Sequence, residues 1–441
     1  MKKFSLKTFR GGVHPDDGKK LSAECPLRPI PAGKTLYYSL AQQAGAPAVP
    51  VVQPGERVLR GQKIAEAGGY VSAPVHASVS GTVQKIQKMR MPAGGLADCI
   101  VIENDGEGKQ AEFQPADYSQ LPPEEILKRI SEAGVIGQGG AGFPTHVKLS
   151  PKNPAEIDTV LINGAECEPY LTSDYRRMTE NPELVVEGLK VILRLFPGAE
   201  GILCVEDNKK SCAEALERAC RGIPNIRVQL LKTKYPQGAE RMLIYAATGR
   251  RINSSMLPAD VGCIVDNVET AVSVYRAVAL GEPLMDCTMT VTGDAAASPE
   301  NLIVPVGMLY REVLEAAGGV SAEPEKMIAG GPMMGNALFT LDTVVTKTSS
   351  ALLLFRKDPV AEQVTTACIN CGRCADVCPG RILPARLAVF ADHGAEEPFL
   401  KYHGMECCEC GCCSYVCPAK RQLSQSIKSM RRMLLAKRKK G

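Results

Sequence analysis

Cys368-Ile-Asn-Cys371-Gly-Arg-Cys374-Ala-Asp-Val-Cys378-Pro379 is the stretch of sequence that decides the fold of the C-terminal region. Its spacing, C-x2-C-x2-C-x3-C-P, occurs a second time between Cys407 and Pro418. Two such runs are the signature of a module with two [4Fe–4S] clusters, in which the fourth cysteine of each run binds the cluster of the other. We therefore assign Cys368, Cys371, Cys374 and Cys417 to the first cluster, and Cys407, Cys410, Cys413 and Cys378 to the second.

Two further cysteines, Cys408 and Cys412, lie inside the second run but outside its spacing. We predict that they are not ligands, and an exchange with the ligand positions stays open. Zinc is the alternative occupant because zinc sites also use C-x2-C pairs, but they seldom repeat four cysteines at this spacing with a trailing proline. The apolar helical pattern of Leu387, Val389 and Phe390 between the runs predicts a helix-rich, ferredoxin-like module.

The composition excludes several classes of protein. With 441 residues, 45% of them hydrophobic and 23% charged, the chain resembles a folded protein of about three domains. Its net charge of +4 is too small to indicate nucleic-acid binding. The sequence contains no apolar run of about 18 residues, so we predict no membrane span. The N-terminus also lacks the apolar run of a signal peptide. Of the 18 cysteines, the ten outside the two ligand sets show no disulfide-like spacing, which together with oxygen-sensitive clusters favours a reducing compartment.

The order of the predicted strands and helices along the chain predicts a multidomain α/β plus α+β fold. Short Val- and Gly-rich runs between residues 47 and 86 predict a small all-β module. From Leu121 strands and helices alternate, which predicts an α/β domain with a largely parallel sheet. The predicted boundaries are 1–120 for the β module, 121–285 for the α/β domain, 286–357 for a small α+β domain, 358–425 for the cluster module and 426–441 for a basic tail.

A glycine-rich loop, Gly137-Gln-Gly-Gly-Ala-Gly142-Phe143-Pro-Thr145, follows a predicted helix that ends near Ala133. Its glycines allow backbone N–H groups to approach a phosphate closely, and Lys148 adds a positive charge nearby. No strand precedes the loop directly, so it is not a Rossmann fingerprint. On its own the loop is a weak signal, and a flexible turn is the alternative interpretation.

The loop and three later segments together resemble the NADH-binding flavoprotein subunit of respiratory complex I. Gly-Gly-Ala-Gly-Phe-Pro-Thr is similar to the flavin loop of that family. Asn163-Gly-Ala-Glu-Cys-Glu-Pro169 is similar to its N-A-D-E-G-E-P segment, Tyr235-Pro-Gln-Gly-Ala-Glu240 to its Y-x-x-G-E-E segment, and Asp266-Asn-Val-Glu-Thr270 to its N-N-V-E-T segment. All four occur in the same order, which argues against chance agreement.

This resemblance implies a site for FMN and a nicotinamide nucleotide, with hydride transfer at the flavin and no separate catalytic residue. The chain departs from the family's segments where Ala165 and Ala239 replace acidic residues, Cys167 replaces glycine and Asp266 replaces asparagine. The resemblance places Phe143, Glu168 and Glu240 against the nicotinamide nucleotide, and it assigns the FMN contacts to Gly137, Gly139, Gly140, Ala141, Gly142, Lys148, Asn163, Glu166, Tyr235, Gly238, Asp266, Asn267 and Thr270.

Nearly the whole chain resembles one family. The stretch from Gln53 to Gly81 is similar to a lipoyl-type barrel-sandwich whose carrier-lysine hairpin holds Val75-His-Ala77 instead, so no swinging cofactor is expected. The stretch from Thr292 to Gly307 resembles an SLBB β-grasp domain. A barrel-sandwich, a flavin domain, an SLBB domain and a two-cluster module, in this order, are typical of the RnfC (RsxC) family. Its members are peripheral subunits of the Rnf ion-translocating electron transport complex.

Membership of that family implies electron transfer between NAD(H) and one-electron carriers on the ferredoxin side, through FMN and two [4Fe–4S] clusters. A flavin is needed because a hydride carries two electrons while each cluster takes one. The implied partners are the membrane and ferredoxin-like subunits of an Rnf complex, at the cytoplasmic face of the bacterial membrane. Two alternatives stay open: a soluble RnfC-like reductase that serves a proline reductase or a cobalamin enzyme, and a relay or scaffold subunit without flavin.

Overall fold

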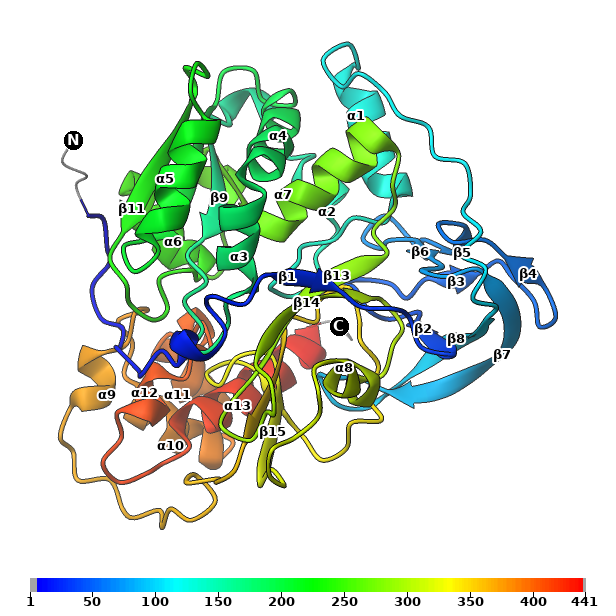
Figure 1. Ribbon diagram of the computed structural model, residues 1–441. Helices are drawn as coiled ribbons and strands as arrows, with labels where there is room; N and C mark the ends of the chain where they lie inside the picture. The colour runs from blue at the N-terminus through cyan, green and yellow to red at the C-terminus, as the bar shows by residue number, and fades with distance from the viewer. Residues whose placement is uncertain (1–5, 439–441) are drawn as a thin grey trace.

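The alternating segments that begin near residue 121 fold into an α/β domain, which confirms the predicted fold class. The computed structural model describes residues 6–438 (Figure 1). The sheet of this domain consists of four parallel strands, in the order β11 (Ile226–Leu231), β10 (Glu200–Glu206), β9 (Thr159–Gly164) and β12 (Cys263–Asn267). Because the carboxyl ends of parallel strands meet at one edge, the loops after β9 and β12 lie side by side.

Helices cover both faces of this sheet (Figure 1). One face carries α1 (Pro123–Glu132), α4 (Pro182–Leu193), α5 (Lys210–Ala219) and α7 (Val268–Tyr275), whose apolar residues share one core with the strands. The other face carries α6 (Glu240–Thr248). The remaining elements are η2 (Pro154–Glu156), α2 (Thr145–Lys148), α3 (Ser173–Glu180), η3 (Pro258–Val261) and the π-helical turn η4 (Arg276–Leu280).

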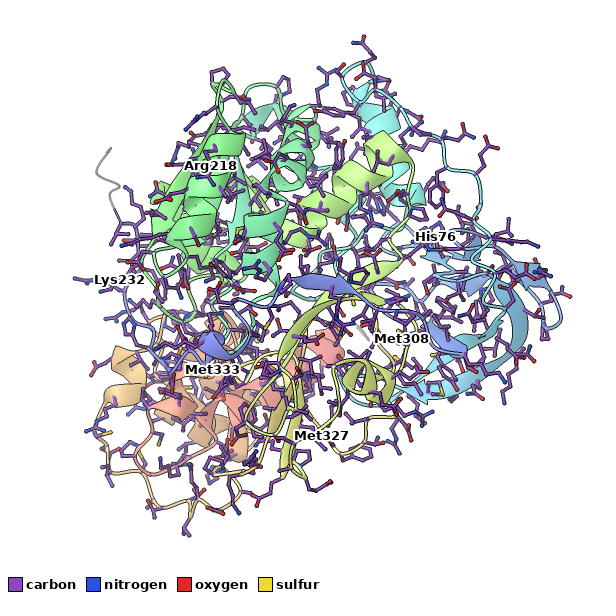
Figure 2. The ribbon with its side chains drawn as sticks, viewed as in Figure 1. His76, Arg218, Lys232, Met308, Met327 and Met333 are labelled. Carbon is purple, nitrogen blue, oxygen red and sulfur yellow. The ribbon has the colours of Figure 1, made fainter. Side chains whose placement is uncertain are left out.

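The N-terminal β module is a sandwich of two small sheets. One sheet has the order β2 (Thr35–Ser39), β8 (Leu96–Asn104), β7 (Gly81–Arg90) and β4 (Arg57–Val58). The other has the order β3 (Val49–Pro50), β5 (Lys63–Glu66) and β6 (Val75–His76). His76, which ends β6, is buried, so this hairpin presents no exposed side chain at the position of a carrier lysine (Figure 2).

The third unit is a six-stranded sheet with one helix, α8 (Tyr310–Ala316). It shares a single apolar core with the barrel-sandwich, so the two units pack as one body. Its first strand, β1, follows the short turn η1 (Lys19–Leu21) and comes from the N-terminal region of the chain. The strand order is β1 (Leu27–Pro29), β14 (Glu300–Pro305), β13 (Asp286–Thr292), β17 (Ala351–Phe355), β15 (Lys326–Ala329) and β16 (Asn336–Leu338).

The C-terminal module is helical, as its apolar pattern predicts. Its longest helix, α13 (Leu423–Arg438), packs against α10 (Pro384–Asp392) and runs past residue 426, where the basic tail is predicted to begin. Within residues 6–438, no helix is both long enough and apolar enough to cross a bilayer. The other elements are α9 (Arg373–Asp376), α11 (Glu396–Lys401), η5 (Gly404–Glu406) and α12 (Cys412–Tyr415).

An N-terminal strap, residues 7–13, joins the α/β domain to the helical module. In Figure 1 it is the blue chain that descends beside β11 toward the orange and red helices. The Val13 N–H donates to the Tyr235 carbonyl oxygen at 2.8 Å, and the Tyr235 N–H donates back to Val13 at 2.9 Å. The neighbouring Gly12 N–H donates to the Val377 carbonyl oxygen at 2.7 Å, next to the cysteine Cys378. The strap therefore fixes the distance between the two units.

We expect the strap to tolerate no side chain at Gly12. Its φ is +79°, and a Cβ there would lie 2.6 Å from the Tyr235 carbonyl oxygen. Gly12→Ala should lower the free energy of unfolding by roughly 1–3 kcal/mol. Gly94→Ala is the matched control because Gly94 has a φ of +89° and nothing within 4 Å of its Cβ position. Equal losses in chemical unfolding of the two variants would contradict a role for the strap contact.

Candidate functional site

A cavity of about 630 Å³ lies where the predicted segments meet. The glycine-rich loop, the loop after β9, the start of α6 and the start of α7 all contribute to its wall. Residues 330–335 of the six-stranded unit and two cysteines of the second run, Cys408 and Cys410, complete it. The predicted site residues that line the cavity are Gly139, Gly140, Ala141, Asn163, Glu166, Glu168, Tyr235, Gly238, Glu240 and Asn267.

The other predicted site residues lie behind this wall or outside it. Thr270 accepts a hydrogen bond from the Gln138 N–H at 2.9 Å, which ties the glycine-rich loop to α7. The Gly137 N–H donates to the carbonyl oxygen of Phe143, a residue that is 38% exposed. The predicted residues that are not part of the cavity lining are Gly137, Gly142, Phe143, Lys148, Asp266 and Thr270.

The glycine-rich loop offers free hydrogen-bond donors to the cavity. Within the described residues, the backbone N–H groups of Gly139, Gly140 and Ala141 have no protein acceptor. Gly139 has a φ of +70°, and a Cβ there would lie 3.1 Å from the amide nitrogen of Asn267. Asn267 in turn caps α7 by accepting the Glu269 N–H at 2.7 Å. Unpaired N–H groups in such a loop suit an anionic phosphate.

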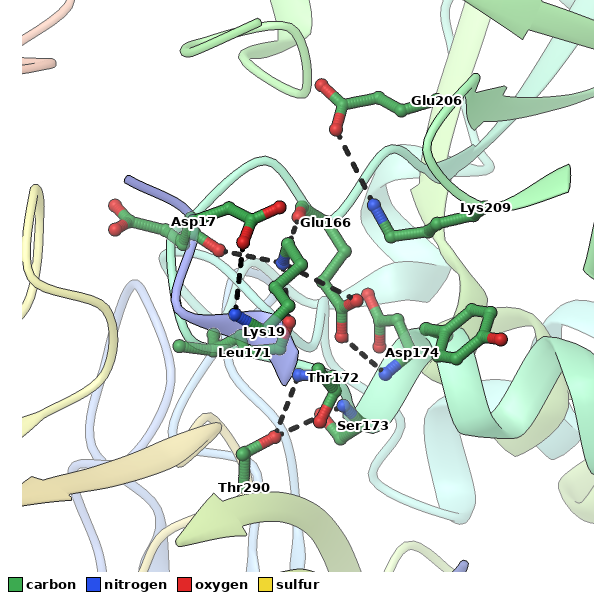
Figure 3. Close-up of polar contacts among 12 residues, drawn as sticks. Asp17, Lys19, Glu166, Leu171, Thr172, Ser173, Asp174, Glu206, Lys209 and Thr290 are labelled. Carbon is green, nitrogen blue, oxygen red and sulfur yellow. Dashed lines mark hydrogen bonds and ion pairs between the residues drawn. The ribbon is translucent and has the colours of Figure 1, made fainter. Parts of the chain in front are cut away.

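Two buried lysines hold the loop after β9 in place (Figure 3). The Lys19 ammonium donates to the carbonyl oxygens of Glu166, Glu168 and Leu171 at 2.9, 3.0 and 2.5 Å. The Lys209 ammonium donates to the Ala165 carbonyl oxygen at 2.7 Å. Neither lysine belongs to the predicted site. No local signal marks them, because Lys19 lies 147 residues from Glu166 in the sequence and Lys209 lies 44 residues from Ala165.

Carboxyl groups crowd this part of the cavity. Burial, with the nearby carboxylates of Glu166 and Glu269, raises the pKa of Asp174 to about 8. Asp174 accepts a hydrogen bond from the Asn267 amide at 2.8 Å, and its N–H donates to Glu166 at 2.8 Å. Burial also raises the pKa of Glu168 to about 7, although the N–H of Met333, labelled in Figure 2, donates to this carboxylate at 3.0 Å. A neutral carboxyl group can donate a hydrogen bond to a ligand.

The residues present fit a polar ring such as the isoalloxazine of FMN. One oxygen each of Glu166, Glu168 and Asp266 is buried without a hydrogen-bond partner among the described residues. Buried polar atoms are normally paired, so the oxygens of Glu166 and Glu168, which line the cavity, indicate a missing ligand. Two residues that differ from the complex I segments, Asp266 and Cys167, also form polar contacts within the protein. Asp266 forms an ion pair with Lys148 at 2.9 Å, and the Cys167 sulfur accepts the Gly238 N–H at 3.3 Å.

The two cysteine runs share one backbone conformation at an interval of 39 residues. Asn370 and Glu409 both have positive φ angles, 56° and 58°, and the glycines two positions later both have a φ of 78°. The short helices α9 and α12 follow those glycines at the same interval. The two runs therefore have the same backbone turns, as two equivalent cluster-binding runs require. Within residues 6–438, no three His, Cys, Asp or Glu side chains converge as they would around a single ion.

A small cavity lies inside the second run. Its wall includes the four cysteines predicted to bind the second cluster, Cys407, Cys410, Cys413 and the crossed ligand Cys378, and it also includes Cys412. Cys408 also lines it, and it is one of the cysteines that line the main cavity. Around the first run, Cys374 and Cys417 pack against the helical core, and Cys371 is exposed.

The whole chain is similar to curated proteins of one kind. It is 43% identical to the C subunit of the proton-translocating ferredoxin:NAD(+) oxidoreductase complex of Clostridium ljungdahlii, over 97% of this chain and 94% of that protein. It is 41% identical to the Na(+)-translocating counterpart of Acetobacterium woodii, over 98% of both chains. The chain belongs to the RnfC family. It is also 37% identical to the corresponding protein of the ion-translocating oxidoreductase complex of Rhodobacter capsulatus, over 86% of this chain and 74% of that protein.

Four domain families match in the predicted order. They are the "RnfC Barrel sandwich hybrid domain" at residues 7–107, the "Nuo51 FMN-binding domain" at 130–276, the "SLBB domain" at 288–337 and the "4Fe-4S binding domain" at 362–383. The predicted family and domain types are therefore confirmed. The FMN-binding and 4Fe-4S families, with the family of the whole chain, likewise bear out FMN, [4Fe–4S] clusters and NAD(H) as the cofactors.

We expect Asp174 to make stability depend on pH. Because the folded protein raises the pKa of Asp174 from 3.8 to about 8, it keeps a proton there that the unfolded chain loses above about pH 4. The resulting stabilisation is lost as pH rises through about 8. Asp174→Asn should therefore flatten the fall in the unfolding temperature between pH 6 and pH 8. Parallel pH profiles for the two proteins would show that Asp174 does not titrate in this range.

The iron content of single-cysteine variants should distinguish cluster ligands from cysteines that are not ligands. A protein with two [4Fe–4S] clusters contains about eight iron atoms, and Cys378→Ser should reduce this toward about four. Cys408→Ser is the matched control because Cys378 and Cys408 line the same small cavity. Cys408→Ser and Cys412→Ser should both keep the full iron content in anaerobic preparations. Loss of iron from either control would overturn the ligand assignment.

Proposed function

We propose that this protein carries electrons between NAD(H) and the ferredoxin side of an ion-translocating complex, the kind of assembly for which its relatives are named. One observation carries the proposal. Cys408 and Cys410, from the second cysteine run, line the same cavity as the four flavin-type segments. The flavin-type segments, where two-electron chemistry is expected, and the second cysteine run, which would accept single electrons, therefore line one cavity.

The predicted residues have distinct tasks in this proposal. The free N–H groups of the glycine-rich loop would hold the FMN phosphate, and the raised-pKa carboxyls of Glu166 and Asp174 would contact its polar ring. Bound FMN supplies the exchange between a hydride and single electrons. Glu168 and Glu240, which line the cavity, would orient the nicotinamide nucleotide. Burial raises the pKa of Glu240.

Electrons would leave through the second cysteine run first. Cys410 is the predicted ligand that lines the main cavity, whereas the first run contributes no residue to its lining. The crossed ligands Cys378 and Cys417 connect the two runs, and both pack in the core of the helical module. The exposed Cys371 would place the first cluster at the surface, where electrons can pass to a partner protein.

The partners in this proposal are the other subunits of the complex, with the protein on the cytoplasmic face of the bacterial membrane. By name, the Clostridium and Acetobacterium relatives are parts of complexes that translocate protons or Na(+). Here the ion movement belongs to the partners. A peripheral attachment agrees with the absence of a membrane-crossing helix from residues 6–438.

The deciding experiment is anaerobic purification of the whole chain, followed by FMN and iron assays and titration with NADH. We expect about one FMN and about eight iron atoms per chain, bleaching of the flavin absorbance by NADH, and a reduced-cluster EPR signal. Clusters without FMN would favour a relay protein. Flavin bleaching without cluster reduction would contradict transfer across the shared wall.

A further inference from the structure

The carboxylate of Glu406 connects the second cysteine run to the α/β domain. Glu406 directly precedes Cys407, the first cysteine of that run. Its Oε2 accepts a hydrogen bond from the Arg241 guanidinium at 2.9 Å and another from the Ser254 N–H at 3.0 Å. Its Oε1 accepts the Ser254 hydroxyl at 2.5 Å and shares the same N–H at 3.1 Å. Arg241, Ser254 and Glu406 together form a clamp, the Glu406 clamp.

Both partners of Glu406 come from one segment of the α/β domain. Arg241 is the second residue of α6 and lines the main cavity beside Glu240. Among the described residues that line this cavity, Arg241 alone is basic. Ser254 lies in the loop between α6 and η3. The clamp therefore bonds the second cysteine run to the wall of the main cavity.

On its other side, Glu406 determines where the second run begins. It ends the short turn η5, and the chain enters the run at the next residue. Cys407 lines the small cavity inside the run, and Cys408 lines both that cavity and the main one. A shift of Glu406 would therefore move the part of the chain that borders both cavities.

The bonds of the clamp are of a strong type. Hydrogen bonds between ionised groups are shorter and stronger than neutral ones. The side chains of Arg241 and Glu406 are 24% and 28% exposed, so water screens this pair less than a fully exposed one. The neighbouring carboxylate of Glu409 pairs instead with Arg431 and Lys428 of α13, within its own module. Of these two carboxylates, Glu406 is the one that bonds to the other unit.

We propose that the Glu406 clamp sets the distance that electrons cross between the main cavity and the second cysteine run. This inference rests on the proposed function, in which NADH becomes NAD⁺ and a proton, and its two electrons pass one to each cluster. Glu406 does not line the main cavity, so it is a positioning residue that acts through Cys407 and Cys408. Electron transfer slows steeply as two centres separate, and misplacement of reacting groups by about 1 Å lowers a rate by a large factor.

The main test follows the anaerobic, FMN- and cluster-loaded protein after rapid mixing with NADH. Glu406→Gln keeps the size of the side chain but removes its charge and one of its two acceptor oxygens. We expect this variant to keep about eight iron atoms and about one FMN, and to bleach its flavin at the unmodified rate. Its clusters should become reduced about tenfold more slowly. Ser254→Ala, which removes a single donor, should slow cluster reduction by a smaller factor.

A second measurement does not depend on electron flow. The Ser254 N–H is bonded to the Glu406 carboxylate, so hydrogen–deuterium exchange in the loop of residues 249–258 should become faster in Glu406→Gln. Mass spectrometry of peptides from this loop measures that exchange. Exchange at the unmodified rate would show that the clamp does not hold the loop, and it would overturn the inference.

Glu409→Gln is the matched control. It removes a carboxylate from the same run, so it has a similar electrostatic effect on the second cluster, but it leaves the clamp intact. It should change neither the exchange of residues 249–258 nor the rate of cluster reduction. Equal slowing in both variants, slower flavin bleaching in Glu406→Gln or loss of its iron would overturn the inference. Failure of the proposed function has a different result: NADH would reduce no cluster in the unmodified protein.

Discussion

The pairing of the Tyr235 backbone with Val13 is the constraint on which the rest of the site depends. Tyr235 is buried, lines the main cavity and lies in one apolar cluster with Cys410 and Cys412. Its backbone is held from the other side by the strap, whose next residue, Gly12, is bonded to the helical module. A shift of this one residue would therefore alter the cavity and its distance from the second cysteine run together. A second connection, the ion pair of Arg241 with Glu406 at 2.9 Å, restrains the same pair of units beside Cys407.

The cavity wall contains buried charged groups, and their burial costs free energy. Isolated ions lose hydration when they are buried, and attraction between them only partly offsets that loss. The protein meets this cost in two ways. Lys19 and Lys209 donate to backbone carbonyls as well as facing the carboxylates, and burial lowers the pKa of Lys19. The carboxyls of Asp174 and Glu168 have raised pKa values, so much of the negative charge is absent near neutral pH. A polar wall of this kind can bind a flavin ring without repelling its phosphate.

The sequence predicts the motif residues of the site better than it predicts the residues from distant segments that complete the cavity wall. Asn163 and Asn267 lie at the ends of two neighbouring parallel strands, and strand order alone brings them together. The glycine-rich loop is recognised from its own local pattern. The crossed cysteine ligands are likewise predicted from spacing, and that assignment stays a prediction. Lys19, Asp174 and residues 330–335 could not be predicted. Lys19 and residues 330–335 contact the loop after β9 from more than a hundred positions away, and no periodicity or motif marks such a residue. Asp174 bonds to Asn267, which lies 93 positions away on another element.

The barrel-sandwich has the fold of a carrier domain but no carrier lysine. It should therefore have a different role in this protein. Lys347 supplies part of the answer. Its ammonium is buried and donates at 2.8 Å to the carbonyl oxygens of Pro74, in the barrel-sandwich, and Gly134, beside the glycine-rich loop. Burial lowers the pKa of Lys347 to about 7, so the protein accepts a destabilised cation at the point where three units meet. Such a costly junction is expected where the relative position of the units matters, and the wall of the main cavity, which the glycine-rich loop and the six-stranded unit build together, requires such positioning.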